Sequence, residues 1–167
     1  MKKILLFVGL LITTFTANAQ IATFQAIYIY NFANNTGWPT ADKDKDFVIT
    51  VIGDTELAHA LTKLSETKKV ANRNVIIHEV PSFKEVKDSQ IVYLGRSKAT
   101  QIQNLRESQR DKQTLIISGK NGHCLYGACI SFVSNDGKLN FEISPNNIAR
   151  HNLTVAKKII TLGTEIQ

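Results

Sequence analysis

Three short apolar runs in this chain each end at a glycine, and this arrangement restricts the fold more than any other feature. Near-continuous apolar runs of this kind are typical of strands that are buried on both faces of a parallel sheet. A further strand is expected at Val75–Val80 (VIIHEV). The three runs are Phe47–Ile52 (FVITVI) before Gly53, Ile91–Leu94 (IVYL) before Gly95, and Leu115–Ile117 (LII) before Ser118-Gly119.

Helical patterns separate these strands. Asp54 or Thr55 is suited to cap a helix, and Ser97 is expected to cap another. The apolar faces would consist of Leu57, Ala60, Leu61 and Leu64 in the first helix and of Ala99, Ile102 and Leu105 in the second. A helix over Ile21–Asn35 precedes them, and a short segment follows at Phe83 to Val86. Strands alternating with helices predict an α/β fold, with a largely parallel sheet flanked by helices on both faces.

The pattern changes near the C-terminus. Ile130–Val133 and Leu139–Ile143 are separated by the turn residues Ser134-Asn135-Asp136-Gly137-Lys138, which predicts an antiparallel β-hairpin. Asn140 and Glu142 alternate with apolar residues and would form its wet face. A final helical region is expected from Ser144-Pro145, and its apolar positions are Ile148, Leu153, Val155, Ile159, Ile160 and Leu162. No linker or internal repeat divides the chain.

The first nineteen residues have the pattern of an export signal. Lys2 and Lys3 precede nine apolar residues, 4–12, and Ala17-Asn18-Ala19 then predicts cleavage before Gln20. The apolar run is far shorter than the roughly 20 residues that span a bilayer. We therefore expect a signal peptide at 1–19 and a single exported domain at 20–167, with no membrane span after removal of the signal.

This expectation changes the meaning of the basic charge. The full chain has a net charge of +6 and a pI of about 9.4. Removal of Lys2 and Lys3 from the 20 basic residues leaves 18 against 14 acidic ones, a net charge of +4. The remaining basic residues are scattered, most with Asp or Glu nearby, as on an ordinary solvated surface. Nucleic acid is therefore not an expected partner.

Motifs for catalysis or cofactor binding are missing from the sequence. It has neither a phosphate-binding loop nor the Gly-x-Ser-x-Gly elbow of hydrolases. His123, Cys124 and Cys129 supply three groups that could bind a metal, but no fourth ligand is recognisable. We expect a protein that is not an enzyme, with no catalytic residue, metal or cofactor.

The strand-end glycines leave a small ligand as an alternative. Open α/β sheets bind ligands in the crevice outside the carboxyl ends of their strands, which is where Gly53, Gly95 and Gly119 are expected. The glycines serve equally well to make tight turns from strand to helix.

The two cysteines, Cys124 and Cys129, lie close together in the sequence. In an oxidising compartment such a pair is expected to form a disulfide. Alternatively, they are two small apolar residues that flank a turn.

Several segments resemble the YfiR/HmsC-like periplasmic proteins, over about Phe24 to Leu162. Gly37-Trp38-Pro39 is similar to the Trp-Pro end of the family's first helix, and GACISF (127–132) and LNFEI (139–143) resemble its C-terminal motifs. Two further segments are similar to the family's strands: FVITVIGDTELAHALTKL (47–64) and IVYLGRS (91–97). Ser131 and Ser144 depart from the family pattern, which has Asn at both positions.

The resemblance implies an exported regulator that binds the periplasmic part of an inner-membrane signalling protein. The implied partner is a diguanylate cyclase or another sensor, and the implied role is to couple envelope or redox state to cyclic-di-GMP signalling and biofilm formation. A homodimer is also compatible. The alternative is a periplasmic small-molecule-binding protein with its ligand at the strand-end crevice.

Candidate partner contacts lie on the hairpin's wet face and around it. Trp38, Phe132 and Phe141 are expected in the core instead. His151 would make binding pH-sensitive, because histidine titrates near neutrality. The candidates are Leu125, Tyr126, Asn140, Glu142, Ile148, Arg150, His151 and Leu153.

Overall fold

A computed structural model describes residues 20–39, 44–135 and 138–167. The signal peptide expected at 1–19 lies outside these described residues, as do positions 136 and 137 of the hairpin turn. In the described part of the chain, no helix has the length and apolar character needed to cross a membrane.

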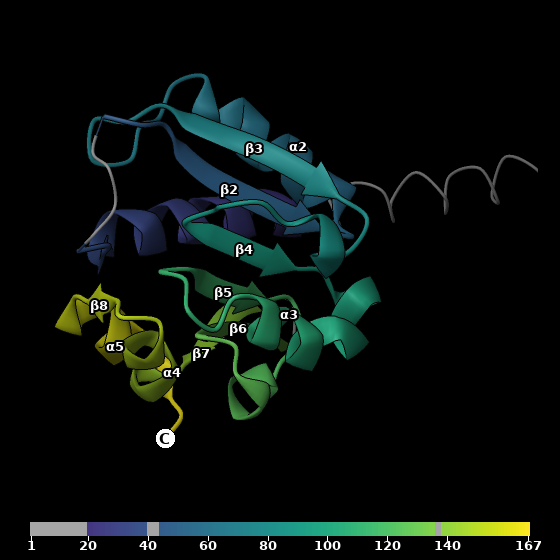
Figure 1. Cartoon of the computed structure of the whole chain (residues 1–167), viewed down its shortest axis with the longest axis vertical. Helices are drawn as coiled ribbons and strands as arrows, with labels where there is room; N and C mark the ends of the chain where they lie inside the picture. The colour runs from purple at the N-terminus through teal and green to yellow at the C-terminus, as the bar shows by residue number, and fades with distance from the viewer. Residues whose placement is uncertain (1–19, 40–43, 136–137) are drawn as a thin grey trace, which may run out of the picture.

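One seven-stranded sheet forms the centre of the molecule, in the order β3-β2-β4-β5-β6-β7-β9. The first five strands in this order are parallel, β6 and β7 form the antiparallel hairpin, and β9 pairs in parallel with β7. In Figure 1 the arrows of β2, β3 and β4 point to the same edge. The predicted fold class is confirmed. The strands are β2 (Phe47–Ile52), β3 (Val75–Val80), β4 (Ile91–Leu94), β5 (Leu115–Ser118), β6 (Ile130–Asn135), β7 (Lys138–Ile143) and β9 (Thr164–Glu165).

Helices cover both faces of the sheet. The first helix, residues 20–35, and α2 (Thr55–Ser65) lie behind the sheet in Figure 1, while α3 (Ile102–Ser108) lies in front. The side chain of Asp54 caps α2 as predicted, because it accepts a hydrogen bond from the Leu57 amide at 3.1 Å. A one-turn helix, η1 (Phe83–Glu85), occupies the predicted short segment between β3 and β4.

Aromatic side chains fill the space between the first helix and the hairpin. Phe32 packs edge-on against Phe141 with ring centroids 4.9 Å apart, and Tyr28 contacts both Phe132 and Phe141. Phe132 and Phe141 are buried, as expected. Such aromatic pairs add about 0.5–1.5 kcal/mol each beyond the burial of their area. They fix the first helix against the end of the sheet that carries β6 and β7.

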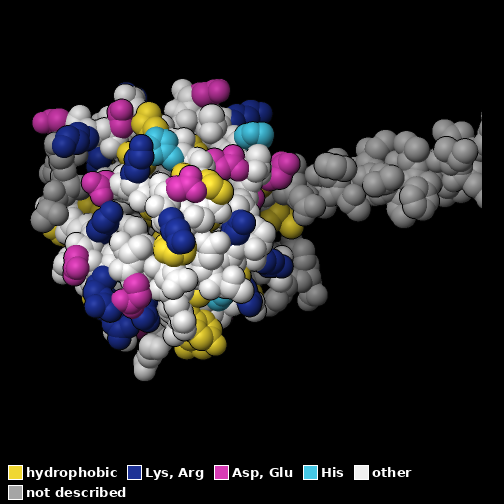
Figure 2. Space-filling view, turned by 45° about the vertical axis from the view of Figure 1, so that its right-hand side comes forward, with side chains coloured by type: hydrophobic (Ala, Val, Ile, Leu, Met, Phe, Trp, Pro, Cys, Tyr) yellow, Lys and Arg dark blue, Asp and Glu magenta, His cyan; other side chains and the backbone are white. Residues whose placement is uncertain are grey.

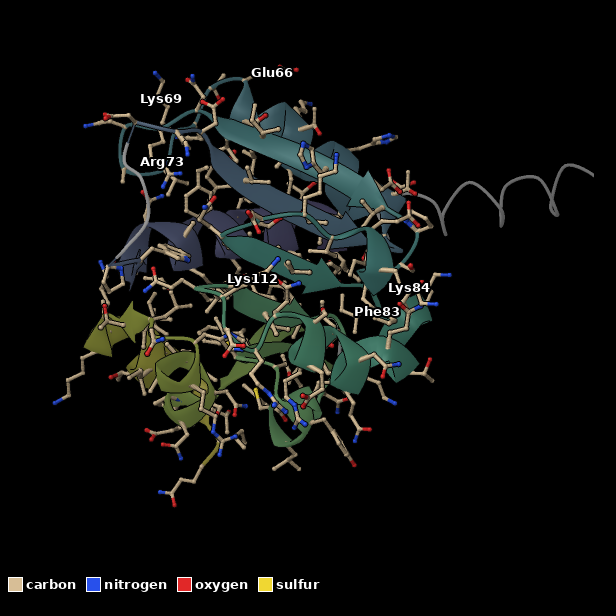
Figure 3. All side chains as sticks on the ribbon, in the orientation of Figure 1. Glu66, Lys69, Arg73, Phe83, Lys84 and Lys112 are labelled. Atoms are coloured by element: carbon tan, nitrogen blue, oxygen red, sulfur yellow. The ribbon has the colours of Figure 1, made fainter. Side chains whose placement is uncertain are left out.

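A second aromatic contact lies just beyond the C-terminal end of the first helix. Trp38 is packed against the core, with its ring 5.1 Å from that of Phe47 at the start of β2. The guanidinium of Arg73, labelled in Figure 3, lies over the ring of Phe47 and donates hydrogen bonds to the Lys45 and Asp46 carbonyls. The guanidinium thus holds the entrance to β2 beside the entrance to β3.

Two helix predictions need correction. Ser97 does not cap a helix, because its hydroxyl donates to the Gly53 carbonyl at 2.7 Å, and a 3₁₀ segment, η2 (Arg96–Gln101), leads into α3. The final helical region is two helices, α4 (Pro145–Arg150) and α5 (Lys157–Leu162). Asn152 has a φ of 53°, and this left-handed residue breaks the helix so that β8 (Thr154–Val155) can pair with β1 (Thr36–Gly37).

Candidate functional site

A single 3₁₀ turn, η3 (His123–Tyr126), presents two neighbouring exposed apolar side chains just before the hairpin. Left-handed glycines lie at both of its ends, with φ values of 75° at Gly122 and 107° at Gly127. A residue with a side chain is strained in this conformation, so the glycines allow the chain to turn sharply twice. Leu125 is 71% exposed and Tyr126 51% exposed. Figure 2 shows hydrophobic side chains gathered at the lower edge of the molecule, the end at which η3 lies in Figure 1.

The inner face of η3 is held by the buried side chains of Asn147 and His123 and by the half-buried side chain of Glu142. The amide of Asn147, on α4, donates to the carbonyls of Cys124 at 2.7 Å and Ala128 at 2.8 Å. The imidazole of His123 is hydrogen-bonded through Nδ1 to the Ser118 hydroxyl at 2.8 Å, and burial lowers its pKa. Glu142 accepts a hydrogen bond from the Gly122 amide at 2.7 Å. These bonds fix the backbone that presents Leu125 and Tyr126.

Both cysteines are free thiols in the structure, so the disulfide expected from the sequence is not formed there. The sulfur of Cys124 lies 3.4 Å from the Ser131 hydroxyl, while Cys129 is fully buried beside β5. Burial raises the pKa of Cys124 to about 11 and that of Cys129 to about 12. In this arrangement the two residues act as small core side chains.

Three arginines lie beside η3. Arg106 on α3, Arg110 just beyond the end of α3 and Arg150 on α4 line a cavity of about 370 Å³, and Gly127, directly after Tyr126, forms part of its wall. Glu107 pairs with Arg106 at 2.6 Å and also with Arg110, and the hydrogen bond from Arg106 is the largest cause that lowers its pKa. The cavity therefore offers more positive than negative charge next to an apolar projection.

We call the exposed part of this region the η3 surface, and it consists of Leu125, Tyr126, Arg106, Arg110 and Arg150. Of the contacts expected from the sequence, it includes Leu125, Tyr126 and Arg150. Arg106 and Arg110 were missed. The sequence places Arg106 on the helix that follows a predicted strand and Arg110 just after it, and the packing of that helix against η3 depends on contacts between segments distant in the sequence.

Three of the remaining candidates are buried, which corrects the expectation that they contact a partner. Ile148 and Leu153 are core residues, 1% and 4% exposed, so they cannot provide the expected apolar contacts to a partner. His151 lines the arginine cavity but is buried, with Nδ1 bonded to the main-chain carbonyl of Lys112 at 3.0 Å (Lys112 is labelled in Figure 3). Asn140 is exposed but lines a different cavity, between the hairpin and the first helix.

The three strand-end glycines have different surroundings. A side chain at Gly95 would collide with the carbonyls of Gly53 and Ile52, so the Gly53–Gly95 pair allows close approach of two backbones. Gly119, by contrast, lines a cavity, and a side chain there would meet the hydroxyl of Tyr93. In the described residues, no three His, Cys, Asp or Glu side chains are grouped to hold a metal ion.

An α/β domain with an exposed apolar turn beside basic side chains has the features of a binding module rather than a catalytic centre. Comparison with family models gives the same class: the YfiR/HmsC-like model matches residues 22–164. The chain belongs to the YfiR/HmsC-like family, whose members are periplasmic regulators of membrane signalling proteins. No curated protein matches the chain.

Proposed function

We propose that this protein is exported to the periplasm, with its signal peptide cleaved before Gln20, and binds the periplasmic part of an inner-membrane signalling protein. Binding would restrain that partner, a diguanylate cyclase or another sensor, and would couple envelope or redox state to its signal. The observation that carries the proposal is the η3 surface, where two exposed apolar side chains adjoin three arginines.

The composition of the η3 surface is that of a protein interface. Tyrosine and arginine are enriched among residues that dominate binding energy, and leucine adds apolar area. Leu125 and Tyr126 project from a turn whose backbone is already fixed by Asn147 and Glu142. A partner therefore meets a preorganised surface, and little ordering entropy opposes the association.

The arginines define the chemistry of the partner surface. Arg106 and Arg110 share Glu107, and Arg150 donates to Asn147 Oδ1 at 3.2 Å, which leaves further donor groups on each guanidinium. The matching surface would present an apolar pocket for Leu125 and Tyr126, and acidic side chains around it. Complementary charge of this kind raises the association rate and selects the partner.

Leu162 provides a matched control for Leu125 in a test of this proposal. Leu162 on α5 is 72% exposed and Leu125 is 71% exposed, so the two leucines differ in place but not in accessibility. A photo-crosslinking amino acid is placed at each position in the exported protein. We expect position 125, and not 162, to crosslink in cells to an inner-membrane protein whose periplasmic domain is joined to a signalling domain.

Purified components complete the experiment. With the periplasmic domain of the captured protein, Leu125→Ala and Tyr126→Ala should each weaken binding about tenfold or more, whereas Leu162→Ala should not. Equal crosslinking at both positions, or recovery of only a second copy of this chain, would contradict the proposal. The second result would assign the η3 surface to a homodimer.

A further inference from the structure

A separate cavity of about 270 Å³ lies at the carboxyl ends of the parallel strands. Its walls come from five parts of the chain: the first helix, the start of α2 after β2, the end of β4 and the turn after it, the turn after β5, and the hairpin. We call it the strand-end cavity. Six of its lining residues carry the argument below: Gln25, Asp54, Glu56, Tyr93, Arg96 and Phe132.

A buried polar network forms one wall of the cavity. The hydroxyl of Tyr93 donates to Oδ2 of Asp54 at 3.2 Å and accepts from Nε2 of Gln25 at 3.4 Å. Tyr93 is 1% exposed and Gln25 8% exposed. Burial raises the pKa of the Asp54 carboxyl, and the nearby charges of Glu56 and Glu79 raise it further. Among the described residues, the Asp54 carboxylate thus accepts hydrogen bonds but forms no ion pair.

Two opposite charges line the same cavity without pairing. In the parts of the chain that the structure describes, neither the Arg96 guanidinium nor the Glu56 carboxylate forms an ion pair. Arg96 is close enough to Tyr93 to influence the titration of its hydroxyl. The cavity therefore presents a cationic group and an anionic pair, Asp54 and Glu56, each free to take a ligand of the opposite charge.

Apolar side chains also line the cavity: Phe132 on β6, Leu139 on β7, and Ile21 and Ala22 on the first helix. Small-molecule sites combine an apolar lining with a few convergent polar groups, and this cavity has both. At about 270 Å³ its volume is just below the roughly 300–1,000 Å³ usual for such sites, so it suits a ligand of few heavy atoms.

We propose that the strand-end cavity binds a small zwitterion, a free amino acid with a neutral apolar side chain. The ligand carboxylate would pair with Arg96, its ammonium group with Asp54 and Glu56, and its side chain would contact Phe132. A nucleotide fits less well, because two carboxylates in the wall repel a phosphate. The inference goes beyond the proposed function and does not rest on it, since none of these residues belongs to the η3 surface.

Titration calorimetry with chemically trimmed ligands tests both charged ends. The probes are L-alanine, L-valine, L-leucine, L-methionine and L-phenylalanine, each titrated into the purified protein up to about 10 mM, a range that detects even weak millimolar binding. For the best of them, we expect the amide, which lacks the carboxylate, and the deaminated acid, which lacks the ammonium group, each to bind about tenfold more weakly.

Two variants test the residues, and a third serves as the control. Arg96→Gln removes the cation, and Asp54→Asn removes a carboxylate while retaining a side chain that caps helices well. Each should weaken binding about tenfold. Arg110→Gln removes the same charge from the η3 surface and should leave ligand affinity unchanged. Thermal unfolding of each unliganded variant shows that it is folded before affinity is compared.

Three results would overturn the proposal. One is the absence of binding by all five amino acids, and another is equal affinity for the intact ligand and both trimmed forms. The third is tighter binding of adenosine monophosphate, used as the nucleotide probe, than of any amino acid. Because Leu125→Ala leaves this cavity intact, failure here is distinguishable from failure of the partner-binding proposal.

Discussion

The strand-end cavity and the η3 surface use polar residues in opposite ways. At the strand-end cavity, Tyr93 and Gln25 are buried, while the half-buried Asp54 and the exposed Glu56 and Arg96 line the same cavity with their charged groups. At η3, the buried polar side chains bond to the backbone, and the exposed side chains are apolar or basic.

Polar side chains would therefore recognise a ligand at the strand-end cavity, whereas at η3 they support the backbone of the turn. In the strand-end cavity the polar side chains themselves would contact a ligand, so a change there alters chemistry. At η3, Asn147 and Glu142 act on the carbonyls and amides of the turn, and Leu125 and Tyr126 would contact a partner. Changes on the inner face of η3 should therefore destabilise the fold, and changes on its outer face should not.

Asn147→Ala should have the largest effect. The substitution leaves the carbonyls of Cys124 and Ala128 without their side-chain donor in a buried region. A buried polar group without a partner costs about 1–3 kcal/mol, so we expect the free energy of unfolding to fall by about 3 kcal/mol. Urea denaturation measures the change.

The exposed neighbour Asn146 provides the control, because Asn146→Ala should shift stability by no more than about 0.5 kcal/mol. Equal losses from both variants would show that Asn147 does not support η3.

Thiol labelling tests the same inner face without a mutation. Because the pKa values of Cys124 and Cys129 are raised to about 11 and 12, few thiolates are present at pH 8, and burial restricts access further. We expect iodoacetamide to label the folded protein about a hundredfold more slowly than a free cysteine. In denaturant without a reductant, both cysteines should then react. If neither reacts under those conditions, the cysteines form the disulfide that their spacing suggests.

The strands could be predicted from the sequence because their residues are apolar without interruption. The bounds of β2, β3 and β4 agree with the expectation residue for residue, and β5 is longer by Ser118 alone. A strand buried on both faces needs only apolar side chains and a turn residue at its end, and both are local signals. Local signals also predicted a cap at Asp54 or Thr55 and the start of a helical region at Ser144-Pro145, and the structure has caps at Asp54 and Ser144.

Features that depend on contacts between distant segments could not be predicted. Ile148 and Leu153 follow an exposed hairpin face in the sequence, but α4 and the segment after it pack against the core, which buries both side chains. A cap at Asp54 could be predicted, but its place in the buried polar network could not. That network requires Tyr93 and Gln25, which are distant in sequence and lie near Asp54 only because the fold brings β2, β4 and the first helix together. Arg106 and Arg150 meet in one cavity for a similar reason.

The free energy of unfolding of the protein should depend on pH through Asp54, which lines the strand-end cavity. Its pKa is raised in the folded state by burial, so the folded protein holds this proton to a higher pH than the unfolded chain does. The stabilisation is therefore complete below the ordinary aspartate pKa, near 4, and is lost as the pH rises through the folded pKa. Asp54→Asn does not titrate and should lack this loss. Urea unfolding at several pH values measures the difference, with the exposed Asp111→Asn as control. A constant offset between wild type and Asp54→Asn would show that burial of this carboxyl has no cost.

Arg110→Gln should have the smallest effect on stability, so it tests most clearly whether the outer face of η3 acts in binding and not in folding. The side chain of Arg110 is 69% exposed and its ion pair with Glu107 is at the surface, so its loss should change the free energy of unfolding by less than about 0.5 kcal/mol.

Binding to the membrane partner should respond differently, because a rim charge acts mainly on the association rate. We expect a lower association rate and a weaker dependence on salt, measured by surface plasmon resonance at several ionic strengths. Lys69→Gln removes the same charge at the opposite end of the molecule in Figure 3 and should leave both rates unchanged. If the two variants slow association equally, the effect comes from net charge, and the arginines beside η3 have no specific role in recognising the partner.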